Sequence, residues 1–433
     1  MTSHLRVVFC THDSPTSIGG PFTWLRRLLP SLRECGIDCR VLALTHFGGT
    51  GPLVEGLRAD GFDVQSVDCH ERTVDDVRWI LSRLQDQVPQ VFVPNFVVAA
   101  YYAARWLKAA GAATVAVLHS DDAFYRAIQQ EFVRGVVSQR VTDVVCVSEK
   151  LLDEVKAGVV QNCPNACYIP YGVNVPKPVT RDYAHRIRIA YVGRFAEEQK
   201  RISLVGRSLD LACRQVPGVE AVMYGDGPDR AVVSTLLEVE RSDSRVVLGG
   251  VIANDKVQSE LLQCDAIMLM SDYEGLPIAL LEGMACGCVP ICRNMNSGIP
   301  QLVQHGKTGL LVSESPESFV AAVRWLSDNP TQAGKLSLEA RQLISQAYSQ
   351  KKSAGEWARL LLQNCDLRPA RLVIPRKLTL PKANPVLESD EKRKLPEPQW
   401  RRKIRKLRIR LGSLRRGLLK RINHSDETPG AAD

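Results

Sequence analysis

Glu274 and Glu282 stand eight residues apart in the stretch SDYEGLPIALLEGMACG. The apolar run before them, residues 264–271, is bounded by polar residues and predicts a buried parallel strand. Glu274 would then lie on the loop after the strand, where its carboxylate could accept hydrogen bonds from sugar hydroxyl groups. Glu282 would lie more than a turn inside the next helix and could accept from the diol of a ribose. The pair favours a nucleotide-sugar site, although a surface loop followed by an amphipathic helix fits two acids alone equally well.

The start of that helix supplies groups that attract phosphate. Pro277 suits a first helical position, because its fixed φ matches the helix and its missing N–H has no partner to lose there. The amides of residues 278–280 would point toward the carboxyl end of the strand, and such a helix end binds anions. The expected nucleotide-sugar contacts on either side of the helix start are Leu276, Pro277, Ile278 and Ala279.

Three further stretches accompany the two glutamates, namely SIGG at 17–20, IAYVGRFAEEQKRISLV at 189–205 and YGDGPDR at 224–230. Together these stretches closely resemble the retaining nucleotide-sugar glycosyltransferases of family 4, which have the two-domain GT-B fold. The resemblance covers about residues 5–365 and is strongest over 187–312. It implies that a hexosyl unit is transferred with retention from a UDP- or GDP-sugar to a glycan or lipid-linked acceptor, in the synthesis of cell-surface polysaccharide or glycolipid.

Two cations fit the diphosphate of such a donor, whose growing negative charge must be stabilised as the glycosidic bond breaks. Arg194 follows the strand IAYVG and can donate to two phosphate oxygens, and Lys200 can add a point charge from the next loop. Each residue alone would more often be a solvated surface residue. Both match phosphate-binding positions of the family, so we expect them to bind the diphosphate.

Gly19 and Gly20 come directly before Pro21, which predicts a helix start after the first strand. Glycines at this place let backbone amides approach a phosphate, because no Cβ stands in the way. A pair of glycines is usually only a turn. In the family, however, the same loop touches the donor diphosphate.

Glycines also mark the expected nucleoside side of the site. Gly225 and Gly227 fit a tight turn and a wall near the nucleotide equally well. The backbone of residues 249–252 is a plausible base pocket, in which Gly249 and Val251 are the expected contacts.

His119 ends the strand TVAVLHS in the first half of the chain. A histidine at a strand end is more often structural, but family members place one here near the transferred sugar. The resemblance therefore implies contact with the sugar and charge stabilisation, and not base catalysis. Asp121 and Asp122 follow and could orient His119 or an acceptor hydroxyl. The expected catalytic residues are Glu274, His119, Arg194 and Lys200.

The sequence offers no obvious enzyme nucleophile. This favours a front-face mechanism, in which the departing phosphate oxygen helps to take the acceptor proton. The triplet Asp272-Tyr273-Glu274 superficially resembles the DxD signature of metal-using glycosyltransferases. It ends a strand, however, and Arg194 and Lys200 already supply positive charge. We expect no essential metal and no cofactor besides the donor.

One departure from the family pattern precedes GKTGLLV. The usual glycine pair and glutamate are replaced by the segment 297–301, with the sequence SGIPQ. The two glutamates of the main motif stay intact, so this departure concerns only the wall of the pocket.

Length and composition agree with a globular protein of two or three domains, with 433 residues of which 45% are hydrophobic. The longest apolar stretch, near 96–104, is too short to span a bilayer. Residues 1–15 indicate a first strand and not a signal peptide. The 13 cysteines lack zinc-finger spacing, so we expect free thiols in a reducing cytosol.

Apolar strands alternate with helical stretches, which predicts α/β architecture with two Rossmann-like parallel sheets facing across a cleft. Expected strands in the first half are 5–10, 40–44, 63–67, 91–96, 114–119, 144–148 and 167–170, with helices at 21–35, 73–87, 97–110 and 149–157. Expected strands in the second half are 187–193, 219–224, 245–248, 264–270, 289–292 and 309–312, with helices at 201–215, 229–241, 254–263, 277–286 and 316–328. The expected divisions are an acceptor domain (1–172), a linker (173–186), a nucleotide-sugar domain (187–348), a closing helix (349–365), a Pro- and charge-rich extended linker (366–398), a basic amphipathic helix (399–422) and a disordered tail (423–433).

The segment 399–422 contains 11 Lys or Arg and no acidic residue. Without it the 56 basic residues fall to 45 against 47 acidic ones, so the net charge changes from +9 to −2. Apolar residues recur at helical spacing at Trp400, Ile404, Leu407, Leu411, Leu414 and Leu418. Such a helix suits an anionic membrane surface, which predicts a cytoplasmic protein bound peripherally to the inner face of the membrane. A solvated tail is the alternative, and a nucleic-acid arm is disfavoured because the apolar stripe has no use on phosphate.

Two other classes of function fit the same fold. One is a non-catalytic sugar-nucleotide sensor or scaffold, and the other is a GT-B phosphorylase or epimerase. The presence of Glu274, Glu282, Arg194, Lys200 and His119 argues against the sensor. The residues do not determine the donor base, the sugar or the acceptor.

Overall fold

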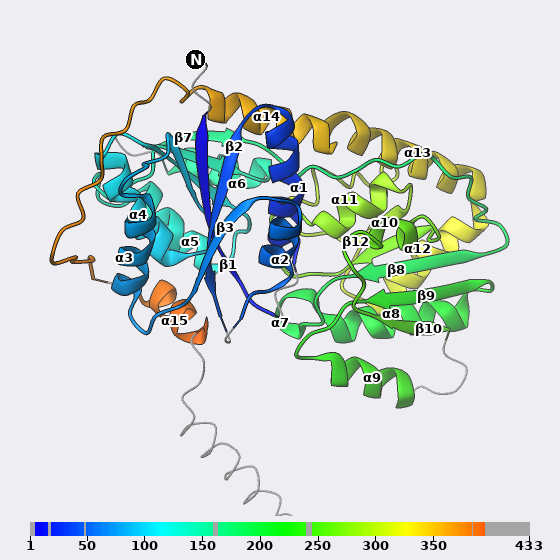
Figure 1. Cartoon of the computed structure of the whole chain (residues 1–433). Helices are drawn as coiled ribbons and strands as arrows, with labels where there is room; N and C mark the ends of the chain where they lie inside the picture. The colour runs from blue at the N-terminus through cyan, green and yellow to red at the C-terminus, as the bar shows by residue number, and fades with distance from the viewer. Residues whose placement is uncertain are drawn as a thin grey trace, which may run out of the picture.

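The computed structural model describes residues 5–15, 19–46, 49–158, 163–239, 245–382 and 384–394, which form two parallel sheets covered by helices (Figure 1). The two sheets confirm the predicted fold class. The basic segment 399–422 and the tail 423–433 lie outside the described residues.

The first sheet has the strand order β3-β2-β1-β4-β5-β6-β7, with every pair parallel. Its inner strands are largely apolar because helices cover both faces, and all six residues of β5 are buried, whereas the edge strand β3 is mostly polar. The strands are β1 (Arg6–Asp13), β2 (Asp38–Thr45), β3 (Asp63–Asp68), β4 (Val91–Pro94), β5 (Ala113–Leu118), β6 (Asp143–Cys146) and β7 (Asn165–Tyr168). The helices are α1 (Gly20–Glu34), α2 (Pro52–Ala59), α3 (Thr73–Leu84), α4 (Val98–Ala109), α5 (Ala123–Ile128), the π-helix η1 (Gln129–Val133) and α6 (Glu149–Ala157).

The second sheet has the order β10-β9-β8-β11-β12-β13 and is also parallel. Helices α10, α11 and α13 lie on one side of it and α8 and α9 on the other (Figure 1). Its strands are β8 (Ile187–Val192), β9 (Val219–Tyr224), β10 (Val246–Gly250), β11 (Ala266–Leu269), β12 (Val289–Arg293) and β13 (Leu310–Val312). Its helices are α7 (Glu197–Lys200), α8 (Ile202–Gln215), α9 (Arg230–Val239), α10 (Val257–Leu261), α11 (Ile278–Ala285), α12 (Pro316–Asp328) and α13 (Pro330–Ala347).

The chain returns to the first domain after α13. Helix α14 (Gln350–Leu362) packs against α1, and its fully buried Trp357 lies 5.6 Å from the ring of Trp24 and 6.4 Å from that of Phe9. The first domain therefore completes its core with a helix from the end of the chain.

The segment after α14 differs from the extended linker predicted over 366–398. Residues 366–382 run along the first domain, and α15 (Pro385–Lys394) packs against α5 (Figure 1, orange). The amide of Ala370 donates to the carbonyl oxygen of Ala110 at 2.8 Å, and that of Leu372 to Gln85 at 3.2 Å. Three leucines of this segment are buried: Leu372, Leu378 and Leu387. They do not recur at helical spacing, so periodicity in the sequence did not predict their burial. We call residues 366–394 the C-terminal strap.

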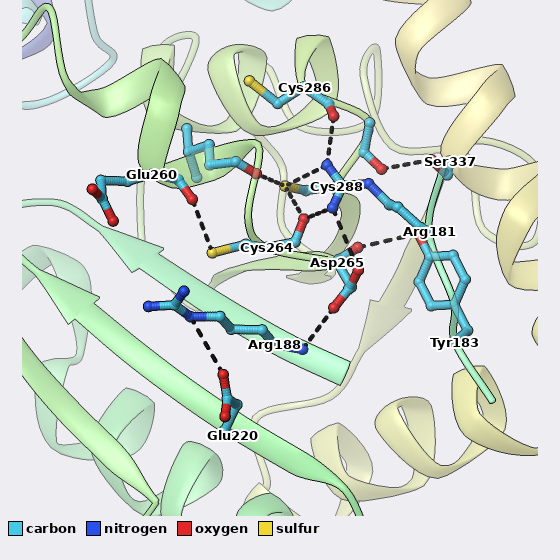
Figure 2. A network of polar contacts seen from close by, with 12 residues as sticks. Arg181, Tyr183, Arg188, Glu220, Glu260, Cys264, Asp265, Cys286, Cys288 and Ser337 are labelled. Atoms are coloured by element: carbon cyan, nitrogen blue, oxygen red, sulfur yellow. Dashed lines mark hydrogen bonds and ion pairs between the residues drawn. The ribbon is translucent and has the colours of Figure 1, made fainter. Parts of the chain in front are cut away.

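The predicted linker 173–186 is anchored in the second domain by the buried side chain of Arg181 (Figure 2). Its guanidinium donates to the carbonyl oxygens of Cys264 and of Cys286, the latter at 2.6 Å, and lies 3.4 Å from the carboxylate of Asp265. Cys286 is the C-cap of α11. The arginine thus satisfies the carbonyl group of Cys286 at the end of α11, and it fixes the far end of the helix that carries Glu282.

All 13 cysteines are free thiols, as predicted from their spacing. Burial raises the pKa of several of them, for example Cys39 and Cys286 to about 12, which makes these thiols unreactive. No group of three or more His, Cys, Asp or Glu side chains in the described ranges is arranged to hold a metal ion. None of the helices described here has an apolar stretch long enough to cross a membrane.

Candidate functional site between the two sheets

The carboxyl ends of the two sheets meet in the folded chain. A Cβ on Gly275, in the loop after β11, would collide with the carbonyl oxygen of His119 at the end of β5. A Cβ on Gly20 would lie 3.3 Å from Cδ1 of Ile278. The N-termini of α1 and α11 therefore lie side by side, one from each domain. Residues Ser17 and Ile18 of the predicted glycine loop fall outside the described residues.

Helix α11 begins one residue later than predicted. Pro277 is the N-cap with φ −73° and ψ 109°, and Ile278 is the first helical residue. Proline cannot cap with its side chain, so the first amide groups of α11 have no side-chain acceptor from the cap. This leaves the helix end suited to an anion. Of the residues expected to line it, Leu276, Pro277 and Ile278 are buried and Ala279 is partly exposed.

Glu274 and Lys200 form an ion pair with side chains only 8% and 16% exposed. Lys200 is the last residue of α7, and Glu274 follows β11, so the pair joins the two loops that the sequence predicted to lie together. An isolated buried charge would be costly, and each partner therefore holds the other in place. A donor phosphate would add a second anion to Lys200.

Arg201 and Asp272, which stand close to this pair in the sequence, belong to a second network of four charged side chains. Arg201 contacts Asp272 at 3.1 Å and Glu314 at 2.8 Å, and Arg293 contacts Asp272 at 2.6 Å and also pairs with Glu314. Arg201 has a left-handed backbone with φ 50°, which is unusual for a residue other than glycine. Asp272, the first acid of the DxD-like triplet, is thus held by two arginines.

Arg194 is exposed and close to the same loop. Its Nη2 lies 3.4 Å from Oε1 of Gln199, whose Nε2 donates to the carbonyl oxygen of Tyr273 at 3.2 Å. This chain of contacts places the guanidinium beside the Asp272–Glu274 stretch. Its exposed guanidinium can turn toward a phosphate.

The sequence left two roles open for Gly225 and Gly227, a tight turn and a pocket wall near the nucleotide. In the structure a Cβ on Gly225 would collide with the carbonyl oxygen of Gly193, and a Cβ on Gly227 with that of Phe195. Gly225 also has a φ of 145°. Both glycines therefore let two loops pack together, and they support the backbone on either side of Arg194.

The predicted base pocket has a similar packing constraint. A Cβ on Gly249 would collide with the ring of Tyr224, and the amide of Gly225 donates to Gly250 at 2.8 Å. Val251 is 51% exposed. This side chain is available to a nucleobase, but its contact with one stays a prediction.

Glu282 has a partner that sequence reasoning missed. It pairs with Arg27 of α1, so the ion pair crosses from the second domain to the first. Burial raises the pKa of Glu282, while Arg27 opposes the rise. The one local signal for a buried partner is that Arg27 lies in a helix whose buried residues include Trp24 and Leu28. No sequence pattern, however, pairs positions 27 and 282.

His119 is buried, with both ring nitrogens engaged. Its Nε2 lies 2.6 Å from the amide oxygen of Asn95, an acceptor, so Nε2 carries the proton and donates. Nδ1 then accepts from the hydroxyl group of Tyr171. Burial lowers the pKa of His119 to about 3, so the ring is neutral at physiological pH. The predicted contact of His119 with a sugar stays a prediction.

The prediction that Asp121 or Asp122 orients His119 is wrong. Asp122 caps α5 and accepts from the amide of Tyr125 at 3.0 Å, and Asp121 pairs with Lys150. Asp122 directly precedes a helix, and an aspartate at that place satisfies helix amides before it can reach a ring.

Four rings stack in a column that runs through His119. The centroid of Phe96 lies 4.9 Å from that of His119 at an interplanar angle of 3°. Tyr171 lies 5.7 Å from His119 at 17°, and Phe22 lies 5.9 Å from Phe96 at 16°. Phe96 has a φ of 63°, a left-handed conformation that is rare for a bulky residue. Sequence could not reveal it, because no glycine marks the position.

The departure from the family pattern over 297–301 lies at the domain boundary. The side-chain oxygen of Gln301 accepts from the amide of Glu149 at 3.0 Å, and its Nε2 donates to the hydroxyl groups of Tyr168 at 2.9 Å and Tyr348 at 3.2 Å. Glutamine can donate and accept at once, which a carboxylate cannot. Gln301 therefore joins the domains, and the effect of this departure on the pocket wall stays a prediction.

Comparison with solved structures identifies the fold as GT-B. A structure of HepE from Anabaena in complex with UDP-glucose superposes with a TM-score of 0.67 at 16% identity, covering 83% of this chain and 100% of that one. The pneumococcal O-GlcNAc transferase GtfA, in complex with UDP and GlcNAc, gives a TM-score of 0.68 at 12% identity over 84% of this chain and 100% of that one.

Sequence comparison agrees. Residues 178–348 match the family described as Glycosyl transferases group 1. The putative colanic acid biosynthesis glycosyltransferase WcaL of Salmonella typhimurium is 30% identical over 162 residues, which are 35% of this chain and 40% of the relative. A GDP-mannose-dependent phosphatidylinositol monomannoside mannosyltransferase of Mycobacterium tuberculosis is 24% identical over 82% of this chain and 98% of that protein. The chain thus spans less than half of WcaL.

Proposed function

We propose that this chain is a retaining glycosyltransferase of family 4 that transfers a hexosyl unit from a UDP- or GDP-sugar to a glycan or lipid-linked acceptor. The observation that carries the proposal is the meeting of the α1 and α11 N-termini beside the buried Lys200–Glu274 pair. Two helix ends and a lysine suit a diphosphate, and a buried carboxylate beside them suits a hexose hydroxyl. The similarity to HepE and to the mannosyltransferase supports a nucleotide-diphosphate-sugar donor.

The donor binds across the boundary between the domains. Its diphosphate takes the amides at the start of α11 and the charges of Arg194 and Lys200. Glu274 accepts from a hydroxyl group of the hexose, which orients the anomeric carbon toward the first domain. The cations stabilise the leaving diphosphate as its negative charge grows.

The acceptor proton goes to the released phosphate oxygen and not to His119. His119 is neutral, and the proton on its Nε2 and the lone pair on its Nδ1 are both engaged, so its ring is not a free base. In the proposed step the bond from the anomeric carbon to the phosphate oxygen breaks, the acceptor oxygen bonds to the same face of that carbon, and the released phosphate oxygen takes the acceptor proton. The configuration is retained.

A two-stage experiment tests the proposal. Thermal-shift titration with UDP, GDP, ADP and CMP identifies the base, and a panel of radiolabelled sugars on that nucleotide identifies the donor. We expect Glu274→Gln to abolish transfer while nucleotide affinity stays nearly unchanged, because Glu274 contacts the hexose. Binding without transfer or hydrolysis of any sugar by the parent protein would instead indicate a sensor. Activity of the variant at the parent's rate would refute the assigned site.

The basic segment 399–422 supports a peripheral position at the cytoplasmic face of an anionic membrane, near a lipid-linked acceptor. The C-terminal strap packs α15 against α5 of the first domain, which is the expected acceptor domain. We expect the full chain to sediment with anionic vesicles at low salt, and a form truncated after residue 394 to stay in solution while still binding nucleotide. Equal sedimentation of both forms would exclude this role.

A third expectation concerns metal. Asp272 is held by Arg201 and Arg293, and Glu274 is paired with Lys200, so both acids of the DxD-like triplet have cationic partners. We therefore propose that the chain needs no divalent cation. EDTA should leave transfer unchanged, whereas a loss of activity that Mn²⁺ restores would overturn this expectation.

A further inference from the structure

Helix α1 sends one arginine across the domain boundary. Arg27 pairs with Glu282 on α11, and the two side chains are 20% and 12% exposed. One of its terminal nitrogens, Nη2, donates to the carboxylate. The other, Nη1, is buried and has no hydrogen-bond partner in the described part of the chain. A buried guanidinium donor without an acceptor is unfavourable, and its presence beside a candidate site indicates a missing ligand oxygen.

The position of this arginine is fixed from both sides. One turn earlier on α1, Oγ1 of Thr23 lies 3.4 Å from Oδ1 of Asn254 in the second domain. Nε2 of Gln350, at the start of α14, donates to the backbone oxygen of Arg27 at 3.0 Å. Together with the contact of Gly20 and Ile278, these bonds hold one face of α1 along the first turns of α11. The guanidinium that carries the unpaired donor therefore lies beside the helix whose start is the proposed diphosphate site.

We propose that Arg27 determines recognition of the donor ribose: Nη2 holds the Glu282 carboxylate in place to accept from the 2′,3′-diol, and Nη1 donates to one of the ribose oxygens. This inference rests on the proposed function, because it assumes that a nucleotide diphosphate lies at the N-terminus of α11. Its consequence is that ribose recognition needs both domains at once. Neither Arg27 nor Glu282 alone could hydrogen-bond the diol in this arrangement, in which one group donates and the other accepts.

The test measures how strongly the protein prefers a complete ribose. The parent protein is titrated calorimetrically with UDP or GDP, whichever binds more tightly, and with the 2′,3′-dideoxy form of the same nucleotide. We expect the dideoxy form to bind about 10- to 100-fold more weakly, the range for a lost charge-assisted hydrogen bond. In Arg27→Met this preference should fall to roughly threefold or less, because the two changes remove the same interaction and are not additive.

A neighbouring arginine gives a matched control. Arg26 lies on the same helix and contacts Asp60 of its own domain at 3.8 Å. Arg26→Met should keep the full preference of the parent for the diol. If Arg27→Met does not fold, Arg27→Lys carries the test: one ammonium group preserves the charge next to Glu282 but lacks the fork that serves two acceptors, so the preference should again fall to roughly threefold or less.

The outcomes separate the two proposals. If neither nucleotide binds the parent protein, the proposed function fails and this inference fails with it. If nucleotide binds and the Arg27 variants keep the diol preference of the parent, this inference alone is overturned. A uniform loss of affinity for both nucleotides would mean that Arg27 only stabilises the domain contact, and would also overturn it.

Discussion

The second domain surrounds Glu274 with charged side chains, whereas the first domain stacks neutral rings on His119. On the loop that carries Glu274 the contacts are ion pairs: Lys200 pairs with Glu274, and Arg201 and Arg293 pair with Asp272. Around His119 they are stacked rings and hydrogen bonds between uncharged groups. Two sheets of the same parallel architecture thus present opposite chemistry at their facing ends. The charged side suits a diphosphate, and the ringed side suits the apolar faces and hydroxyl groups of sugars.

Removal of Lys200 should produce the largest effect. Lys200→Ala leaves Glu274 buried without a partner, which should lower the free energy of unfolding by about 3–5 kcal/mol. The double variant Lys200→Ala/Glu274→Gln removes the stranded charge and should recover most of that loss. Urea denaturation measures both. If the double variant were no more stable than the single one, charge would not be what holds this side together.

Removal of Arg194 should have a smaller effect, on binding and not on stability. Its guanidinium is exposed and makes one long contact with Gln199. Arg194→Ala should weaken binding of the nucleotide diphosphate by about 1.5–3 kcal/mol, the loss of a hydrogen bond to a charged group. Calorimetric titration tests this. The control is Arg126→Ala, which removes an exposed arginine on α5 of the first domain and should bind nucleotide as the parent does. An equal loss of affinity in this variant would contradict the contrast between the domains.

The ringed side should be sensitive to acid. The folded pKa of His119 is lowered to about 3 by burial, whereas an unfolded histidine titrates near 6.5. Below about pH 6.5 the unfolded chain therefore binds a proton at His119 that the folded chain does not bind. The contribution of His119 to the free energy of unfolding is complete above about pH 6.5 and is lost as the pH falls toward 3. Between pH 7.5 and 5.5 the parent should lose about 1.4 kcal/mol that His119→Gln does not lose. Parallel pH profiles of the two proteins would contradict a neutral, buried ring.

The smallest effect concerns the backbone of Phe96. Phe96→Ala and Phe96→Gly both remove the ring, but only glycine adopts a φ of 63° without strain. We expect the glycine variant to be more stable than the alanine variant by about 1 kcal/mol, the reverse of the usual order in regular structure. Thermal unfolding of the two variants measures the difference. Equal stabilities would show that the strain at Phe96 is not real.

The sheets were predictable because parallel strands are buried on both faces and leave continuous apolar runs in the sequence. Candidate residues on the segments that follow β8 and β11 were predictable for a related reason, since the carboxyl ends of parallel strands share one edge. The structure accordingly brings Lys200 to Glu274. The domain contact between Gly275 and His119, by contrast, follows from no pattern within either half.

What sequence reasoning missed depends on distant partners or on strain. The pair of Arg27 and Glu282 joins positions 255 apart, and nothing local at either position specifies the other. The C-terminal strap has buried leucines without a period, so it resembled a linker. Pro277 fits the first turn and the cap equally well by its φ, and its ψ of 109° decided for the cap.

The return of α14 to the first domain has a consequence for synthesis on the ribosome. Trp357 fills a space between Phe9 and Trp24, so the first domain lacks part of its core until the second has been translated. At roughly 5–20 residues per second, the stretch from residue 172 to 357 takes about 10–40 s. During that interval the nascent first domain exposes the apolar surface that Trp357 later covers, which is the kind of surface that chaperones bind.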